Sequence, residues 1–276
     1  MQLQMNNLYP TKNETKFILL FFLITISILG TSQPLNLLKS SIKVVVIDAG
    51  HGGKDPGCHG HSKINEKDVA LDIALKLGKI IEENLPEVRV IYTRKDDRFI
   101  ELWQRAAIAN RNKADLFISV HCNAHTNSTL NGAESYVMGI HKTNGNLAVS
   151  RRENESLQLE ANYQESGHYS DFDPDSPEAQ IILSLYQNSF LGHSIELAST
   201  LQDKVKAKGS LRDLGVNQAG FVVLWKTTMP SVLVETGFLT NAKDEAYLTS
   251  EKGKNESARN IFEAVRDFKV KLEATK

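Results

Sequence analysis

The stretch that most constrains the fold is residues 44–57, where a short apolar run leads directly into a glycine-rich loop. Val44 to Ile47 is a continuous β-branched run, which is typical of a buried strand covered on both faces. In the loop that follows, glycines surround His51 and allow backbone conformations that a Cβ would forbid. Because open α/β sheets bind ligands at the carboxyl ends of their strands, the loop is a candidate binding site. A loop of this kind can also cradle a phosphate or serve only as a turn.

The alternation of apolar strands and helical stripes continues along the chain. Asn65 is the expected N-cap of a helix whose apolar stripe begins at Val69. Further strands are expected at 88–92, 116–120, 132–138, 220–224 and 231–235, and further helices at 100–112, 181–206, 242–247 and 255–271. The helix at 181–206 is expected in one piece or broken near Gly192. This order predicts an α/β fold with an open, mostly parallel twisted sheet of about six strands and helices on both faces.

The amino-terminal segment differs from the rest of the chain. An apolar run from Phe17 to Leu29 follows two lysines and precedes small residues. The run is shorter than the ~20 residues that a membrane span requires, so it indicates a signal peptide over residues 1–32. The chain is then exported to the periplasm, or tethered to the inner membrane if the segment is not cleaved. Residues 33–276 are expected to form a single catalytic domain.

The composition excludes one class of partner. Hydrophobic residues make up 41% of the 276 residues and charged residues 24%, as in ordinary globular proteins. The net charge is −1, with no basic stripe along the sequence. Nucleic-acid binding is therefore not expected.

Chemically capable side chains stand at the ends of three predicted strands: His51, His121 and Glu235. The carboxyl ends of parallel strands meet at one edge of a sheet. Glu66 lies on the inward stripe of the following helix, where it is either a helix cap or a metal ligand. Two histidines and one glutamate are a known zinc ligand set, and a second carboxylate can then move protons. The sequence contains no Gly-x-Ser-x-Gly elbow and no Gly-Lys-Ser/Thr phosphate loop.

Four motifs follow one another along the chain: Ile47–Gly53 with Asp55–Gly57, Asn65–Lys67, Ser119–Ala124 and Val234–Asn241. Taken together, they resemble those of the zinc-dependent N-acetylmuramoyl-L-alanine amidases (amidase type 3), a family of cell-wall hydrolases. The resemblance spans about residues 43–270 and implies one Zn²⁺ per chain, held by His51, Glu66 and His121, with Glu235 as the catalytic acid/base.

The resemblance also implies the reaction. The substrate would be peptidoglycan, and the bond cut would be the amide between the lactyl group of N-acetylmuramic acid and the first L-alanine of the stem peptide. Such an enzyme serves cell-wall turnover or daughter-cell separation. Two alternatives stay open: a zinc peptidase or deacetylase acting on another exported substrate, and an inactive peptidoglycan-binding module.

Residues 140–192 are polar and are expected to include a short helix at 151–160 and a loop at 163–177. They resemble an insertion that blocks the zinc cleft in some of these amidases until an activator, of the LytM type, displaces it. In this chain Glu153, Glu155 or Glu160 could fill the open position of the metal. The alternative is a solvated surface helix or a wall-binding rim.

Other residues carry weaker predictions. Arg94 and Arg105 are candidate ligands for stem-peptide carboxylates, and Asn123 is a candidate for substrate binding or for orienting the strand end at His121. Cys58 and Cys122 each lie close in sequence to a candidate site residue. They either form a disulfide, as an exported protein permits, or remain separate thiols.

Overall fold

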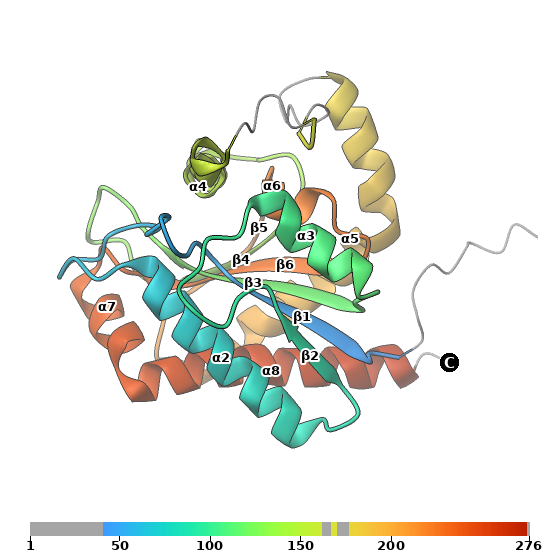
Figure 1. Ribbon diagram of the computed structural model, residues 1–276. Helices are drawn as coiled ribbons and strands as arrows, with labels where there is room; N and C mark the ends of the chain where they lie inside the picture. The colour runs from blue at the N-terminus through green and yellow to red at the C-terminus, as the bar shows by residue number, and fades with distance from the viewer. Residues whose placement is uncertain (1–40, 162–166, 170–176, 275–276) are drawn as a thin grey trace, which may run out of the picture. The chain divides into compact units, whose positions relative to one another are not determined.

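The computed structural model describes residues 41–161, 167–169 and 177–274. The predicted signal peptide at 1–32 and most of the predicted loop at 163–177 lie outside these residues. The described part contains a six-stranded sheet in the order β2-β1-β3-β6-β4-β5 (Figure 1). Four of the five strand pairs are parallel, and only β4 and β6 pair antiparallel. The predicted fold class is therefore confirmed.

The elements have the following bounds. The strands are β1 Val44–Ala49, β2 Arg89–Tyr92, β3 Leu116–Asn123, β4 Ala133–Met138, β5 Asp213–Ala219 and β6 Ser231–Phe238. The helices are α2 Glu66–Asn84, α3 Leu102–Arg111, α4 Asn144–Asn154, the 3₁₀-helix η1 Glu155–Leu159, α5 Pro177–Lys208, α6 Val222–Trp225, α7 Ala242–Thr249 and α8 Glu251–Ala274. Among the described residues, no helix has the length and apolar character needed to cross a membrane.

One predicted strand is wrong. Residues 220–224 were expected to form it, but Val222–Trp225 is a short buried helix and the strand lies just before it, at Asp213–Ala219. A short apolar run does not by itself distinguish a strand from a buried helical turn. The real strand is a half-buried edge strand that mixes polar and apolar residues around a glycine, so it has no continuous apolar run. Helix α5 continues through Gly192 without a break.

Helices cover both faces of the sheet. On β1, Val45 and Ile47 face the larger core, which is filled mainly by α2, α5 and α8, whereas Val46 faces the smaller core beneath α3 and α6. Figure 1 shows α2 and α8 next to each other on the same face. Because the central strands β1, β3 and β6 are buried from two sides, their positions are fixed, and so are the positions of their carboxyl ends.

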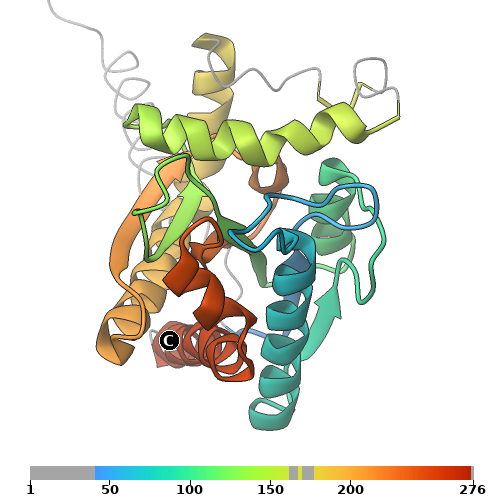
Figure 2. The same ribbon diagram turned by 90° about the vertical axis from the view of Figure 1, so that its left-hand side faces the viewer.

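The central strands β1, β3 and β6 present their carboxyl ends at one edge of the sheet. There His121 on β3 pairs in register with Glu235 on β6. Figure 2 shows α4 lying across this edge of the domain, in yellow-green. Helix α4 is thus the cover of the edge at which the sequence predicts the site.

Candidate metal centre

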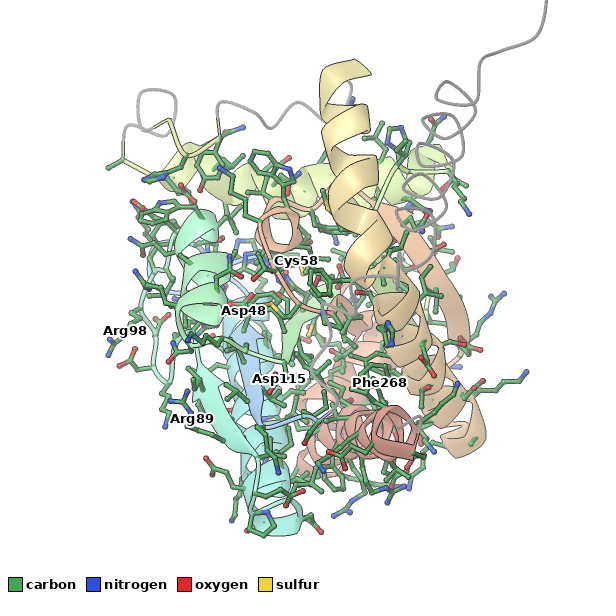
Figure 3. The ribbon with its side chains drawn as sticks, turned by 90° about the vertical axis from the view of Figure 1, so that its right-hand side faces the viewer. Asp48, Cys58, Arg89, Arg98, Asp115 and Phe268 are labelled. Carbon is green, nitrogen blue, oxygen red and sulfur yellow. The ribbon has the colours of Figure 1, made fainter. Side chains whose placement is uncertain are left out.

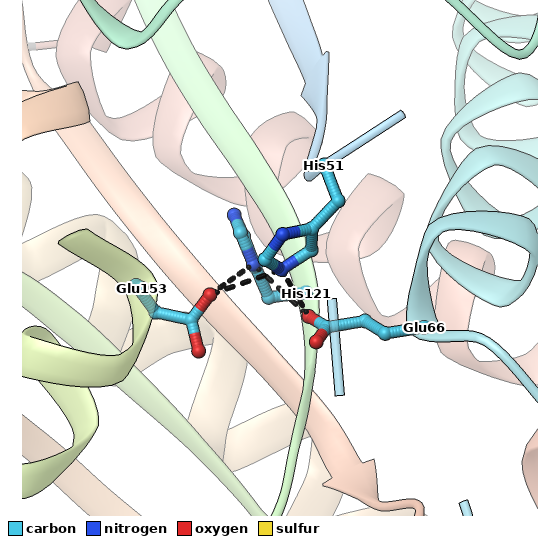
Figure 4. Close-up of side chains that lie close together, drawn as sticks. All are labelled: His51, Glu66, His121 and Glu153. Atoms are coloured by element: carbon cyan, nitrogen blue, oxygen red, sulfur yellow. Dashed lines mark hydrogen bonds and ion pairs between the residues drawn. The ribbon is translucent and has the colours of Figure 1, made fainter. Parts of the chain in front are cut away.

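Four side chains converge at this edge, each from a different element. His51 follows β1, Glu66 begins α2, His121 lies on β3 and Glu153 lies on α4 (Figure 4). Each offers one ligand atom, all of these atoms lie within 4.8 Å of one another, and all four residues are buried. The structure thus brings His51, Glu66 and His121 together and adds one glutamate from the segment predicted to be a lid.

The distances within this cluster are those of groups that share a cation. His51 Nε2 lies 3.1 Å from Glu66 Oε1 and 3.1 Å from Glu153 Oε2. His121 Nδ1 lies 3.1 Å from Glu66 Oε1 and 2.9 Å from Glu153 Oε2. Apart from these contacts within the cluster, His51 Nε2 and Glu153 Oε2 have no hydrogen-bond partner among the described residues. Imidazole nitrogens and carboxylate oxygens that converge in this way fit a zinc-type ion.

The cluster shifts its own pKa values in opposite directions. Burial alone would lower the pKa of His51, but the negative charge of Glu66 raises it well above its usual value. Burial would also lower the pKa of His121, but the negative charge of Glu153 raises it to about 9. Burial would raise the pKa of Glu66, yet the charge of His51 brings it below the usual range. The imidazole nitrogens that bind protons this strongly are the same atoms that a metal cation would bind in place of the protons.

Glycines bring the loop close to the strand ends. A Cβ on Gly50 would lie 2.4 Å from Cε1 of His121, so only glycine permits this approach. Gly57 has a φ of 67°, and a Cβ there would lie 2.7 Å from Glu66 Oε2. His51 has a φ of 59°, a left-handed conformation that costs a non-glycine residue ~1–3 kcal/mol and is most often found at functional sites.

A second layer of hydrogen bonds orients the ligand atoms. His51 Nδ1 lies 2.9 Å from Asp55 Oδ2, so Nε2 is the nitrogen that faces the cluster. The two carboxylate oxygens of Glu66 accept from the backbone N–H groups of Cys122, at 2.9 Å, and Cys58, at 3.0 Å. Asp55 lies in the Asp-Pro-Gly motif, four residues after the histidine, but was not among the predicted site residues. Carboxylates in this position commonly fix the tautomer of a metal-binding histidine.

Glu235 is fully buried beside the cluster but does not belong to it. Its Oε1 lies 3.5 Å from Arg152 Nη2, and its Oε2 has no hydrogen-bond partner among the described residues. Burial, reinforced by the negative charge of Glu153, raises the pKa of Glu235 well above its ordinary value. A carboxyl group with a raised pKa is suited to taking up and returning protons near neutral pH.

Arg94 and Arg105, the candidate ligands for stem-peptide carboxylates, are buried beneath the loop and bind groups of the protein itself. They are 2% and 1% exposed. Arg94 donates to the carbonyls of Ala49 and Gly50, at 3.0 and 2.6 Å. Arg105 donates to the carbonyl of His51 at 2.9 Å and to Asp48 Oδ1 at 2.9 Å. Both arginines thus hold the start of the His51 loop in place through hydrogen bonds to its backbone carbonyls.

Asp48 completes this support. It is fully buried inside the domain, whereas Arg98 lies at the periphery (Figure 3). Burial alone would raise the pKa of Asp48, but the positive charge of Arg105 and hydrogen bonds from Ser119 and Thr93 bring it below its usual value. The loop that carries His51 is therefore held to the sheet by a satisfied, buried ion pair.

Of the three predicted lid carboxylates, only Glu153 enters the cluster. Glu155 is exposed, and Glu160 accepts hydrogen bonds from Leu102 N at 2.6 Å and from Tyr169 Oη at 2.5 Å. The helix predicted at 151–160 begins earlier, at Asn144, because Thr143 caps it by accepting from Asn146 N. A cavity of about 350 Å³ lies between the loop at His51 and η1.

Cys58 and Cys122 are free thiols. Cys58 Sγ donates to the carbonyl of Cys122 at 3.5 Å, and burial raises the pKa of both thiols. Of the two alternatives, the structure has separate thiols. Asn65 takes the predicted N-cap position of α2, but its side chain contacts His59 at 3.1 Å instead of capping the helix.

Comparison with known proteins decides the family. A sequence profile of the N-acetylmuramoyl-L-alanine amidases matches residues 45–267. The chain belongs to this family. The resemblance seen in the sequence motifs is thereby confirmed. Amidase AmiA of Escherichia coli K12 is 34% identical over 241 residues, which make up 87% of this chain and 80% of AmiA.

Solved structures of amidases share the fold. An N-acetylmuramoyl-L-alanine amidase from Clostridium difficile 630 is 28% identical with a TM-score of 0.61, covering 83% of this chain and 97% of its own. The CwlD amidase from Clostridioides difficile, solved in complex with the GerS lipoprotein, is 26% identical with a TM-score of 0.58, covering 82% and 98%.

Proposed function

We propose that this amidase is a zinc hydrolase that cleaves the amide between the lactyl group of N-acetylmuramic acid and L-alanine in peptidoglycan. The observation that carries the proposal is the buried meeting of His51, Glu66 and His121 beside Glu235. Membership in the amidase family supports the assignment of this amide as the bond that is cut. The proposed roles are cell-wall turnover or daughter-cell separation.

In the proposed mechanism His51, Glu66 and His121 would hold the metal, and Glu153 contacts both histidines while α4 is in place. A zinc ion bound there would acidify water and polarise the amide carbonyl. Glu235 takes a proton from the attacking water and returns it to the leaving nitrogen of L-alanine. Asp55 keeps His51 in the tautomer that presents Nε2.

The test is a digest of purified peptidoglycan with and without a chelator, followed by product analysis. The proposed activity releases stem peptides with L-alanine amino termini, leaves the glycan strands intact and stops when the metal is removed. Cuts inside the stem peptide would indicate a zinc peptidase, and released acetate a deacetylase. A wall-binding module would bind the material and cut nothing.

We further propose that α4 and η1 form an inhibitory lid. Glu153 contacts both histidines, where it would exclude water from a bound metal, and Arg152 lies against Glu235. Adjacent residues of one helix thus cover both the metal ligands and the catalytic carboxylate. By analogy with CwlD, which was solved with a lipoprotein partner, an activator protein is expected to displace the lid. Deletion of 141–190 with folding retained should raise peptidoglycan hydrolysis. Unchanged activity would contradict inhibition.

The amino-terminal segment remains a prediction. We propose export to the periplasm with cleavage near Ser32, which leaves a catalytic domain over 33–276. Amino-terminal sequencing of the protein recovered from the periplasm tests this, because an intact segment in the membrane fraction would instead indicate an anchor.

A further inference from the structure

Four oxygen atoms beside the candidate metal centre hold the guanidinium group of Arg152. One is Glu153 Oε1 on the same helix, 2.9 Å from Nε, and the other three lie on the sheet side. Arg152 donates through Nη1 to the carbonyl of Ala124 at 2.7 Å and through Nη2 to Asn123 Oδ1 at 3.0 Å. The same Nη2 lies 3.5 Å from Glu235 Oε1. We call Ala124 O, Asn123 Oδ1 and Glu235 Oε1 the acceptor triad. The triad belongs to the ends of β3 and β6, whereas its occupant belongs to α4.

The sheet side fixes the triad independently of the arginine. Asn123 donates through Nδ2 to Glu134 Oε1 at 2.6 Å, and its Oδ1 accepts from the backbone N–H of Ala124 at 2.8 Å. Glu134 Oε2 accepts in turn from Asn217 Nδ2 at 2.8 Å. Because Nδ2 faces a carboxylate, which accepts only, Oδ1 of the buried Asn123 must face Arg152. If Arg152 leaves, three fixed acceptors remain.

The second carboxylate oxygen of Glu235, next to the triad, also lacks a donor. Oε2 of Glu235 is buried without a hydrogen-bond partner among the described residues. A buried carboxylate oxygen is unfavourable unless a donor reaches it, so an unpaired one indicates a ligand or a proton that is still to come. The group that fits this place is a compact donor of several N–H bonds, positively charged, at the side of the cluster where Glu235 acts.

We propose that the acceptor triad binds the nitrogen of the L-alanine whose amide bond is cut, and that Arg152 is its stand-in under the lid. This inference rests on the proposed function. In the substrate the nitrogen offers one N–H. When the carbon–nitrogen bond breaks, the water oxygen bonds to the carbonyl carbon, giving a carboxylate, and the protons of water end on the nitrogen, giving an ammonium group. Its three N–H donors match the three acceptors of the triad.

The test measures binding of a product-like peptide, L-alanyl-D-glutamate, to the full chain by titration calorimetry. Arg152→Ala should bind the free-amine peptide about tenfold or more tightly than the unmodified chain, as expected for charged hydrogen bonds that are no longer blocked. It should also prefer the free amine to the N-acetylated peptide. Arg151→Ala is the matched control, since this neighbour on the same helix is exposed and should change nothing.

Adding Asn123→Ala to Arg152→Ala should remove the preference for the free amine. If that double variant does not fold, the side-chain amide NMR signals of Asn123 in Arg152→Ala should shift with the free-amine peptide and not with the N-acetylated one. Glu153→Ala uncovers the metal side but keeps Arg152, so it should gain no such preference.

Equal binding of both peptides to Arg152→Ala, or a preference that survives loss of Asn123, would overturn the inference. A peptidoglycan digest with the same variants separates this result from the proposed function. Hydrolysis without any amine preference contradicts the triad alone. Amine preference without hydrolysis contradicts the proposed function and leaves the triad as an amine site.

Discussion

Helices α2 and α4 each deliver one glutamate to the same cluster, but they are anchored very differently. Helix α2 buries a broad apolar stripe that includes Val69, Ile73 and Leu77. Helix α4 buries only Val149, Ser150 and its cluster residue, Glu153. Beyond the cluster, α4 and η1 are attached mainly through polar contacts, such as Asn154 with the carbonyl of Gly220 at 2.8 Å.

The difference teaches which carboxylate belongs to the working site. Apolar burial is the main source of stability for a packed helix, so α2 opens only when the domain unfolds. Helix α4 buries little apolar surface, so under the proposed lid function we expect it to leave while the domain stays folded. Glu66 is therefore expected to be a permanent ligand, and Glu153 a removable one.

The largest expected effect comes from the catalytic carboxylate on the packed sheet, Glu235. Glu235→Gln keeps the shape of the side chain but cannot carry a proton between water and the leaving amine. The rate of peptidoglycan hydrolysis should fall by a factor of ~10²–10⁴. Zinc content, measured by elemental analysis, should stay at the level of the unmodified chain. Loss of the metal together with activity would place Glu235 among the ligands instead.

A pair of core substitutions compares the two anchors directly. Ile73→Ala in α2 should lower the free energy of unfolding by ~2–5 kcal/mol, since it leaves a cavity in the main core. Val149→Ala in α4 should leave global unfolding nearly unchanged and accelerate amide hydrogen exchange within 144–154. Equal losses of stability in chemical denaturation would show that α4 is part of the folded core.

Asp55→Ala tests the orientation of the fixed ligands. Without the carboxylate at Nδ1, His51 loses the bond that presents Nε2 to the cluster. Zinc affinity, measured by competition with a chromophoric chelator, should fall by ~10–100-fold. The exposed neighbour Lys54→Ala is the control and should bind zinc normally. Unchanged affinity in Asp55→Ala would limit this carboxylate to shaping the loop.

The smallest expected effect is on the pH dependence of stability. The pKa of Asp48 is lower in the folded chain than the unfolded value of ~3.9, so its contribution is complete above that pH. As pH falls below about 4 toward the folded pKa, protonation removes the contribution. Asp48→Asn should flatten the decline of Tm in this range. An unchanged acid slope would show that the Asp48–Arg105 pair does not anchor the loop.

The sheet and the site residues at its strand ends could be predicted from the sequence, because their signals are local. Buried strands gave the sheet, and His51, His121 and Glu235 stand at strand ends, where topology gathers them. The strand at 213–219 was missed because this half-buried edge strand mixes polar and apolar residues and lacks a continuous apolar run. The resemblance gave the motifs their chemistry, which spacing alone left open.

The lid and the supporting contacts could not be predicted in the same way. Three glutamates of residues 153–160 were equally good candidates, and only packing selects Glu153. Arg94 and Arg105 were expected at the substrate, yet their donors are taken by loop carbonyls far away in sequence. Such contacts depend on which elements meet in space, and no sequence period records that.

The most direct test of the central claim compares Glu66→Gln with Glu153→Gln, measuring zinc content and release of L-alanine-terminated stem peptides in the same preparations. Both substitutions remove one cluster carboxylate, but only Glu66 is held by the packed sheet side. Glu153→Gln should keep its zinc and hydrolyse peptidoglycan faster than the unmodified chain, whereas Glu66→Gln should lose both zinc and activity. Loss of zinc and activity in Glu153→Gln would contradict the account.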